Sequence, residues 1–248
     1  MSPLSAVVFS VLTLTRSAVL CKFKNPLYHW NPAQPIKIWM SRDMPDIHQR
    51  MIVKALDFYS EVTCFKFNTA SISLFSLDIE YVRVYHNSQD RGVPDQMLIF
   101  QYNSFLGCSS PLGKAEISND VNIYVGCGTF TTVLHEIGHI LGLTHTQQRP
   151  DRDEYVTVKL PQKHSKVFGL QYKKETQCRE TYDVPYDYGS IMHYNPVAGL
   201  KNRSSPILIA RDTLKQYTMG NKAWPSITDL LLINHHYSCF DNCKPYAV

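Results

Sequence analysis

Apolar and polar positions predict three helices. Asp46 to Val62 carries an apolar residue every three or four positions, which is the spacing of one helix face; these residues are Ile47, Met51, Ala55, Phe58 and Val62. A second helix is predicted from about Thr129 to Leu141. The last runs from Ser226 to Tyr237, where Ser226 followed by Asp229 resembles a helix N-cap with an acidic partner.

Shorter apolar or alternating segments predict strands, while the rest of the chain reads as loop. The predicted strands are Pro35–Met40, Cys64–Phe67, Leu77–Val84 and Val121–Val125. Residues 85–120 are rich in Gly, Pro, Ser and Asn, so we predict a loop there. Beyond Pro150 the periodicity weakens, and only the final helix stands out.

Composition describes an ordinary folded protein. The chain has 248 residues, of which 44% are hydrophobic and 19% charged, which suits one domain of two lobes or two small domains. The net charge of +4 comes from scattered basic residues without a Lys/Arg run, so nothing favours a nucleic-acid partner.

The first twenty residues resemble a secretory signal peptide. Ala6–Leu14 is apolar, and the small residues Ser17 and Ala18 follow it. The run is too short, and too interrupted by Arg16, to predict a membrane span. We therefore expect a signal over residues 1–20 and a secreted protein. The alternative is a frayed N-terminus that is no signal, in which case the protein would stay inside the cell.

The cysteines favour an oxidising compartment. There are seven, and an odd number normally indicates a free thiol; they are Cys21, Cys64, Cys108, Cys127, Cys178, Cys239 and Cys243. Removal of Cys21 with the signal would leave six, which fits a disulfide-bonded domain. Asn202 begins a sequon that could carry a glycan in a secreted protein.

The segment HEIGHILGLTH, from His135 to His145, has the residues of a catalytic metal site. His135 and His139 are four residues apart, so a helix places both rings on one face, within reach of one zinc ion. Glu136 can approach a zinc-bound water, whose pKa falls to about 7, and remove its proton. Gly142 tolerates the positive φ of a sharp turn, after which His145 can supply a third ligand.

Three protein ligands leave a coordination position for water, which argues against a purely structural zinc site. The competing interpretation is a histidine-rich helix that matches by accident. The pattern HExxHxxGxxH fixes five positions, and average residue usage gives a chance match of about 10⁻⁵. Further along, DYGSIMHY places Met192 where a Met-turn could lie beneath the histidines, and Tyr194 where a phenol could approach the metal or a substrate oxyanion.

These residues carry a specific resemblance. HEIGHILGLTHTQQRPDRDEY resembles the zinc signature of the astacin family of metzincin proteases, and YDYGSIMHY resembles its Met-turn. The likeness runs from about Ile36 to Cys239. It implies an α+β metzincin fold over residues 21–244. The N-terminal lobe (about 30–145) would hold a twisted mixed sheet and two long helices, and the C-terminal lobe (about 146–244) would be largely irregular with a terminal helix.

The resemblance also implies roles for individual residues. His135, His139 and His145 would bind one Zn²⁺ per chain. Glu136 would be the general base and later the proton donor. Tyr194 would be a further zinc ligand at rest that swings away to stabilise the tetrahedral intermediate.

Disulfides and substrate binding are implied in the same way. Cys64 would pair with Cys239 and Cys108 with Cys127, while Cys178 and Cys243 have no family counterpart and could form a third pair. Val121–Tyr124 resembles the edge strand on which family members bind an extended protein or peptide substrate. We expect a monomeric, secreted zinc metalloendopeptidase. The alternative is a catalytically impaired member that binds zinc and peptide without efficient cleavage.

Two departures from the family set the chain apart. The family has glutamate after the third histidine, where it helps to hold a buried N-terminus, but this chain has Thr146. Too few residues separate the expected signal from the protease domain for the family's prodomain, unless a mispredicted gene start hides one. Together these differences suggest that latency and burial of the N-terminus are absent or altered here. Both departures, together with Thr131 where the family often has glycine, lend the impaired alternative some weight.

Overall fold

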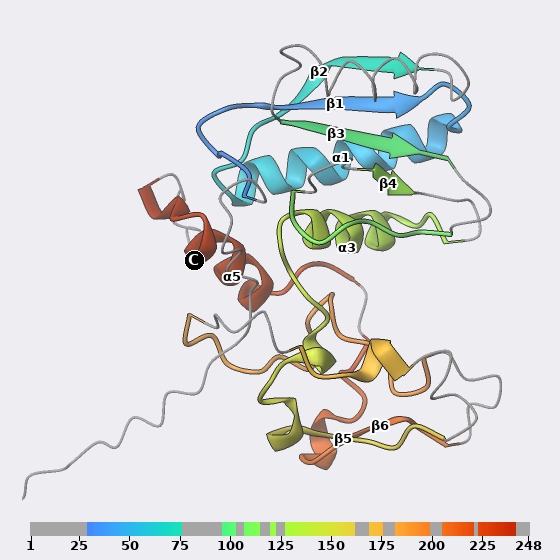
Figure 1. Cartoon of the computed structure of the whole chain (residues 1–248), viewed down its shortest axis with the longest axis vertical. Coiled ribbons are helices and arrows are strands. Elements are labelled where there is room, and N and C mark those ends of the chain that lie inside the picture. The colour runs from blue at the N-terminus through green and yellow to red at the C-terminus, as the bar shows by residue number, and fades with distance from the viewer. Residues whose placement is uncertain are drawn as a thin grey trace, which may run out of the picture.

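The computed structural model describes residues 29–75, 96–102, 107–114, 120–122, 127–161, 169–175, 182–198, 205–220 and 223–241. Several expectations fall outside these ranges: the signal over 1–20, the strand Leu77–Val84, the Cys178–Cys243 pair and the sequon at Asn202. The cartoon in Figure 1 has the larger sheet with its helices at one end of the molecule and a two-stranded pair at the other.

The larger sheet has the strand order β2-β1-β3-β4. Its strands are β1 (Ile36–Ser41), β2 (Phe67–Phe75), β3 (Met97–Gln101) and β4 (Asp120–Asn122). All three pairings are parallel, so the sheet expected to be mixed is parallel in its described strands. The helix α1 (Asp46–Val62) connects β1 to β2, and such a crossover brings the second strand back parallel to the first.

Two strand predictions were wrong in detail. β3 lies within the segment predicted as loop, because its MLIFQ core is buried throughout and therefore shows no alternation. The strand predicted at Cys64–Phe67 overlaps β2 at Phe67 alone, because β2 runs from Phe67 to Phe75.

The predicted helix α1 is confirmed from Asp46 to Val62, but its buried face lies one residue away from the predicted one. Ile47 is 48% exposed, whereas Ile52, Ala55 and Leu56 are fully buried. Tyr59 completes this face, and its hydroxyl donates to the Leu134 carbonyl at 2.9 Å. The prediction counted only apolar residues, so it did not identify the helix face that includes the buried Tyr59.

The other two predicted helices are also confirmed. α3 (Phe130–Ile140) begins at the cap Thr129, whose side chain accepts from the Thr132 amide. α5 (Ile227–His236) begins at Ser226 with the full capping box to Asp229. No helix among the described residues is long and apolar enough to cross a membrane.

Two hydrophobic clusters form the interior. The larger one unites the sheet, α1, α3 and α5, and it includes Met192. The smaller one surrounds the antiparallel pair β5 (Val156–Val158) and β6 (Leu208–Ala210) and is rich in tyrosine. Disulfides join Cys64 to Cys239, after α1 and α5, and Cys108 to Cys127, just before α3. α3 thus packs in the larger core, and one disulfide holds the chain just before its start.

Candidate metal centre

The turn after α3 brings the third histidine back to the first two. The helix ends at Ile140, and Gly142 adopts φ +99°, a conformation that a side chain would strain. The Gly142 amide donates to the His139 carbonyl, and the Leu143 amide donates to the Gly138 carbonyl, both closing the helix end. The reversal that the glycine predicted is therefore confirmed.

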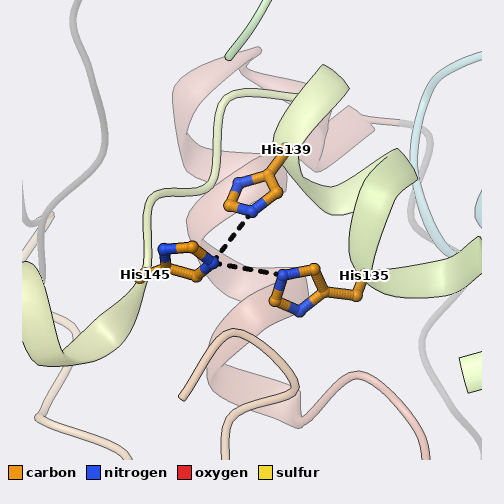
Figure 2. Close-up of side chains that lie close together, drawn as sticks. All are labelled: His135, His139 and His145. Atoms are coloured by element: carbon orange, nitrogen blue, oxygen red, sulfur yellow. Dashed lines mark hydrogen bonds between the residues drawn. The ribbon is translucent and has the colours of Figure 1, made fainter. Parts of the chain in front are cut away.

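The three histidine rings converge (Figure 2). The Nε2 atom of His145 lies 3.2 Å from Nε2 of His139 and 3.3 Å from Nε2 of His135. One ligand nitrogen from each ring lies within 4.8 Å of the other two. The three side chains are therefore close enough to hold one metal ion.

Oxygen acceptors on the far side of each ring fix its tautomer. Nδ1 of His135 donates to the Ile191 carbonyl at 2.8 Å, and Nδ1 of His139 donates to the Leu143 carbonyl at 2.7 Å. Nδ1 of His145 faces Oε1 of Gln148 at 3.2 Å. Because carbonyl oxygens only accept, each Nδ1 carries the proton and each Nε2 presents a lone pair.

This arrangement fits a zinc ion. Lone pairs as close as 3.2 Å repel one another unless a cation lies between them. Tetrahedral coordination with Zn–N bonds of about 2.0–2.1 Å separates two ligand nitrogens by about 3.3 Å, close to the spacing found. Burial, then the neighbouring His145 and His135, hold the pKa of His139 well below its usual range, so this ring is neutral, as a ligand must be.

Glu136 lies on the same helix with only 6% of its surface exposed. Ser110 donates to its Oε2 atom at 2.7 Å and also lies 3.0 Å from its backbone carbonyl. Ser110 falls in the segment predicted as loop, where no functional residue was expected. Nothing in its spacing from Glu136, 26 residues away, could have indicated the contact.

Tyr194 stands beside the histidines. Its ring centroid lies 4.5 Å from that of His145, and its hydroxyl donates to Oε1 of Gln171 at 3.0 Å. Gln171 belongs to the short helix η4 (Gly169–Tyr172). Burial, and secondarily the charge of Glu136, raise the pKa of the Tyr194 phenol, which keeps it protonated and able to donate.

The backbone of Tyr194 is held by its neighbour. His193 donates through Nδ1 to the Tyr194 carbonyl at 2.7 Å, and its Nε2 faces the Tyr186 hydroxyl at 2.9 Å. Burial lowers the pKa of His193 to about 4, so the ring is neutral and can accept from Tyr186. The side chain of Tyr194 therefore starts from a fixed peptide.

Met192 lies directly beneath the metal helix. It is 1% exposed, and a Cβ added to Gly138 would approach its sulfur to 3.0 Å. Gly138 thus allows the Met192 turn to approach α3 between the two helical histidines. The Thr146 amide donates to the Met192 carbonyl at 3.2 Å, which connects the same turn to the residue after His145.

Asp229, on α5, holds the turn before Met192 through hydrogen bonds. Its carboxylate accepts from the Ser190 hydroxyl at 2.6 Å and from the Ile191 amide at 3.0 Å, while it also caps its own helix through Ser226. Because Ile191 is the acceptor for His135, the contact ties the end of α5 to a metal ligand. The sequence pattern indicated only the cap, since the second role depends on a tertiary contact.

Thr146 occupies the position where the family has glutamate. It is buried, and its hydroxyl donates to the Ser190 oxygen at 3.0 Å, so it joins the Asp229 hydrogen-bond chain. A small cavity adjoins it, lined by Leu143, Thr144, Thr146, Arg149, Pro185, Asp187, Ser190, Met192, Thr228, Asp229 and Leu232. The threonine therefore gives this cavity a hydroxyl where a carboxylate would add charge.

Comparisons with known proteins agree with this site. The model of the peptidase family described as Astacin matches residues 22–238. The chain is 32% identical over 214 residues to zinc metalloproteinase nas-36 of Brugia malayi, covering 85% of this chain and 32% of that protein. It is also 32% identical to zinc metalloproteinase nas-23 of Caenorhabditis elegans, covering 90% of this chain and 38% of that one. The chain thus spans about a third of the length of these curated relatives.

A solved structure shares the fold. High choriolytic enzyme 1, a hatching enzyme zinc-protease from the medaka Oryzias latipes, superposes with a TM-score of 0.69. The match covers 89% of this chain and 99% of that one at 22% identity, so the likeness is one of fold. The expected α+β metzincin fold is confirmed.

Proposed function

Because this chain belongs to the astacin family of peptidases, we propose that it is a zinc-dependent metalloendopeptidase that hydrolyses internal peptide bonds of proteins. The observation that carries the proposal is the convergence of three Nε2 lone pairs beside the buried carboxylate of Glu136. A site built only to hold a structural ion has no need of a base next to its ligands.

The cofactor is zinc, and His135, His139 and His145 would hold it. When bound, zinc supplies Lewis-acid chemistry, polarising a substrate carbonyl and making water more acidic. Glu136 takes a proton from the attacking water and returns it to the leaving amine. The Tyr194 hydroxyl, which starts from its hydrogen bond to Gln171, donates to the oxyanion that develops on the substrate carbonyl.

The substrate would bind as an extended strand. Among the described strands β4 is the outermost of the sheet, and an edge strand can pair with a peptide backbone. This supports the expected contact near Val121–Tyr124, of which Val121 and Asn122 are described and belong to β4. We propose that protein or peptide substrates add to this edge and that the chain acts as a monomer.

We further propose that the protein is secreted and that its protease domain spans residues 21–244 in two lobes. Two disulfides among the described residues support an oxidising compartment. The two hydrophobic clusters support the lobes, although α5 and Met192 pack with the larger cluster.

The alternative, a member that binds peptide without efficient cleavage, is not favoured. Thr146 and Thr131 suggested it, but Thr146 is hydrogen-bonded and the three histidines, Glu136 and Tyr194 are all present at the site. The test is cleavage of a quenched fluorescent protein substrate. Activity should vanish with a zinc chelator and return with added Zn²⁺. A purified, zinc-loaded protein that leaves a broad peptide library uncut would favour the alternative.

A further inference from the structure

Ser110 contacts the carboxylate that the proposed reaction depends on. Its hydroxyl lies 2.7 Å from Oε2 of Glu136 and 3.0 Å from the Glu136 backbone carbonyl. A serine has one hydroxyl proton, and the shorter distance to a charged acceptor makes the carboxylate its main partner. The Glu136 side chain is therefore held from outside its own helix.

The segment that carries Ser110 is held at two points, one just before α3 and one on it. The disulfide between Cys108 and Cys127 ties it to the chain just before the helix. On the other side of Ser110, the Gly113 amide donates to the His139 carbonyl at 2.8 Å, with Gly113 at φ +70°. Ser110 thus lies between two fixed points of the chain, one of them bonded to the backbone of His139.

We propose that Ser110 is a positioning residue for Glu136, one that holds the carboxylate in the orientation needed for proton transfer. The inference rests on the proposed hydrolytic function. A glutamate side chain has three rotatable bonds, and its rotamer freedom must be lost before the proton can move. The Ser110 hydrogen bond fixes Oε2 and thereby directs Oε1 toward the attacking water.

The two oxygens then have different tasks through the whole reaction. The O–H bond of water breaks as its oxygen bonds to the substrate carbonyl carbon, and the proton passes to Oε1. When the C–N bond breaks, the same proton leaves Oε1 for the amine nitrogen. Ser110 keeps its own proton in both steps, so its contribution is orientation and it is neither acid nor base.

The first experiment compares three single variants of the zinc-loaded chain. Ser110→Ala removes the donor, and Ser110→Thr keeps a hydroxyl at the same position. Ser109→Ala makes the same chemical change at the exposed neighbouring residue. For each variant, kcat and KM are measured on a fluorescent peptide, together with zinc affinity by chelator competition and the midpoint of thermal unfolding.

We expect Ser110→Ala to lower kcat by about ten- to a hundredfold, the loss typical of a hydrogen bond to a charged group. KM should stay within about twofold, and zinc affinity and the unfolding midpoint should stay near the wild-type values, since the ligands are untouched. Ser110→Thr should restore most of kcat, and Ser109→Ala should match the wild type. Ser110→Gly repeats the loss of the donor if alanine disturbs folding. A wild-type kcat in both donor-free variants would overturn the proposal.

The second experiment distinguishes a failure of the Ser110 proposal from a failure of the proposed hydrolytic function. Glu136→Asp shortens the side chain by one methylene, so its carboxylate no longer reaches Ser110. The Ser110→Ala change should then cost less than about twofold in this background, because paired effects are not additive. An equal loss in both backgrounds would overturn the proposal. Full activity in Glu136→Gln would instead sink the proposed function itself.

Discussion

Asp229 accepts a hydrogen bond from the backbone amide of Ile191 at 3.0 Å. The carbonyl of Ile191 in turn accepts the Nδ1 proton of His135, so the N-terminal end of α5 fixes the ring of a proposed metal ligand through one residue. Partners of this kind set the orientation and basicity of ligand histidines. The relationship explains why a helix far from the metal segment in the sequence belongs to the metal site.

Asp229→Asn should weaken zinc binding by about ten- to a hundredfold, the range found when a partner behind the ligands is lost. Asparagine keeps the shape but turns one acceptor oxygen into an amide donor, so it cannot accept from Ser190, Ile191 and Ser226 together. Chelator competition measures the change. Asp212→Asn alters another capping aspartate, one that is exposed beside β6, and should leave affinity unchanged. Equal affinity in both variants would refute the link.

The same residue gives a pH dependence. Burial raises the pKa of the Asp229 carboxyl above its usual range, against the opposing hydrogen bonds from Ser190, Ser226 and Ile191. The folded state then binds this proton more tightly than the unfolded chain. Its contribution to the free energy of unfolding is therefore greatest below about pH 3.9, and it falls as the pH rises to the raised value.

Asp229→Asn lacks this titration. The free energy of unfolding of the wild type, minus that of the variant, should decline from about pH 3.5 upward and then become level. Denaturant unfolding at a series of pH values, in the same chelator for both proteins, measures the difference. A difference that rises with pH would mean that the hydrogen bonds outweigh burial.

Gly138→Ala should destabilise the fold although alanine favours helices. An added Cβ would lie 3.0 Å from the Met192 sulfur, and overpacking in a buried site costs about 1–3 kcal/mol. Better helix propensity returns about 1 kcal/mol, so we expect a net loss of about 1 kcal/mol in chemical denaturation. Gly169→Ala, where the added Cβ meets nothing within 4 Å, should cost nothing. A more stable Gly138→Ala would show that Met192 moves aside freely.

Thr146 can be tested by two substitutions of different kinds. Thr146→Val removes only the hydrogen bond to Ser190 and should cost about 1 kcal/mol of unfolding free energy. Thr146→Glu adds a buried charge beside Asp187 and Asp229, which line the same cavity, while Arg149 in that lining is already paired with Asp151. The change should therefore cost about 3 kcal/mol or more. Thermal unfolding compares the two. Wild-type stability in Thr146→Glu would indicate a compensating cation, either Arg149 in the same cavity or a buried N-terminal amine.

Local signals predicted the elements that depend on local residues. The spacing of apolar residues in Asp46–Val62 predicted α1, and Ser226 with Asp229 predicted the start of α5. The convergence of the three histidines was predictable because helix geometry and a single glycine turn determine where His135, His139 and His145 lie. Each of these features depends on residues that are close together in the sequence.

Features that depend on distant parts of the chain could not be predicted. β3 is buried throughout, so no alternation marks it, and β5 and β6 have three residues each, too few to show a period. Ser110 and Asp229 reach the site only through folding. The buried face of α1 was assigned one residue away, because Tyr59 is buried with its hydroxyl bonded to Leu134.

The most direct test of the account compares the wild type with Glu136→Gln, both loaded with zinc, on one protein substrate. Metal analysis serves as the control. We expect one zinc per chain in both proteins, since the three histidines are unchanged. We predict that the wild type cleaves the substrate and that Glu136→Gln, which cannot accept the proton, loses at least about 100-fold in kcat. Equal cleavage by the two zinc-loaded proteins would contradict the account.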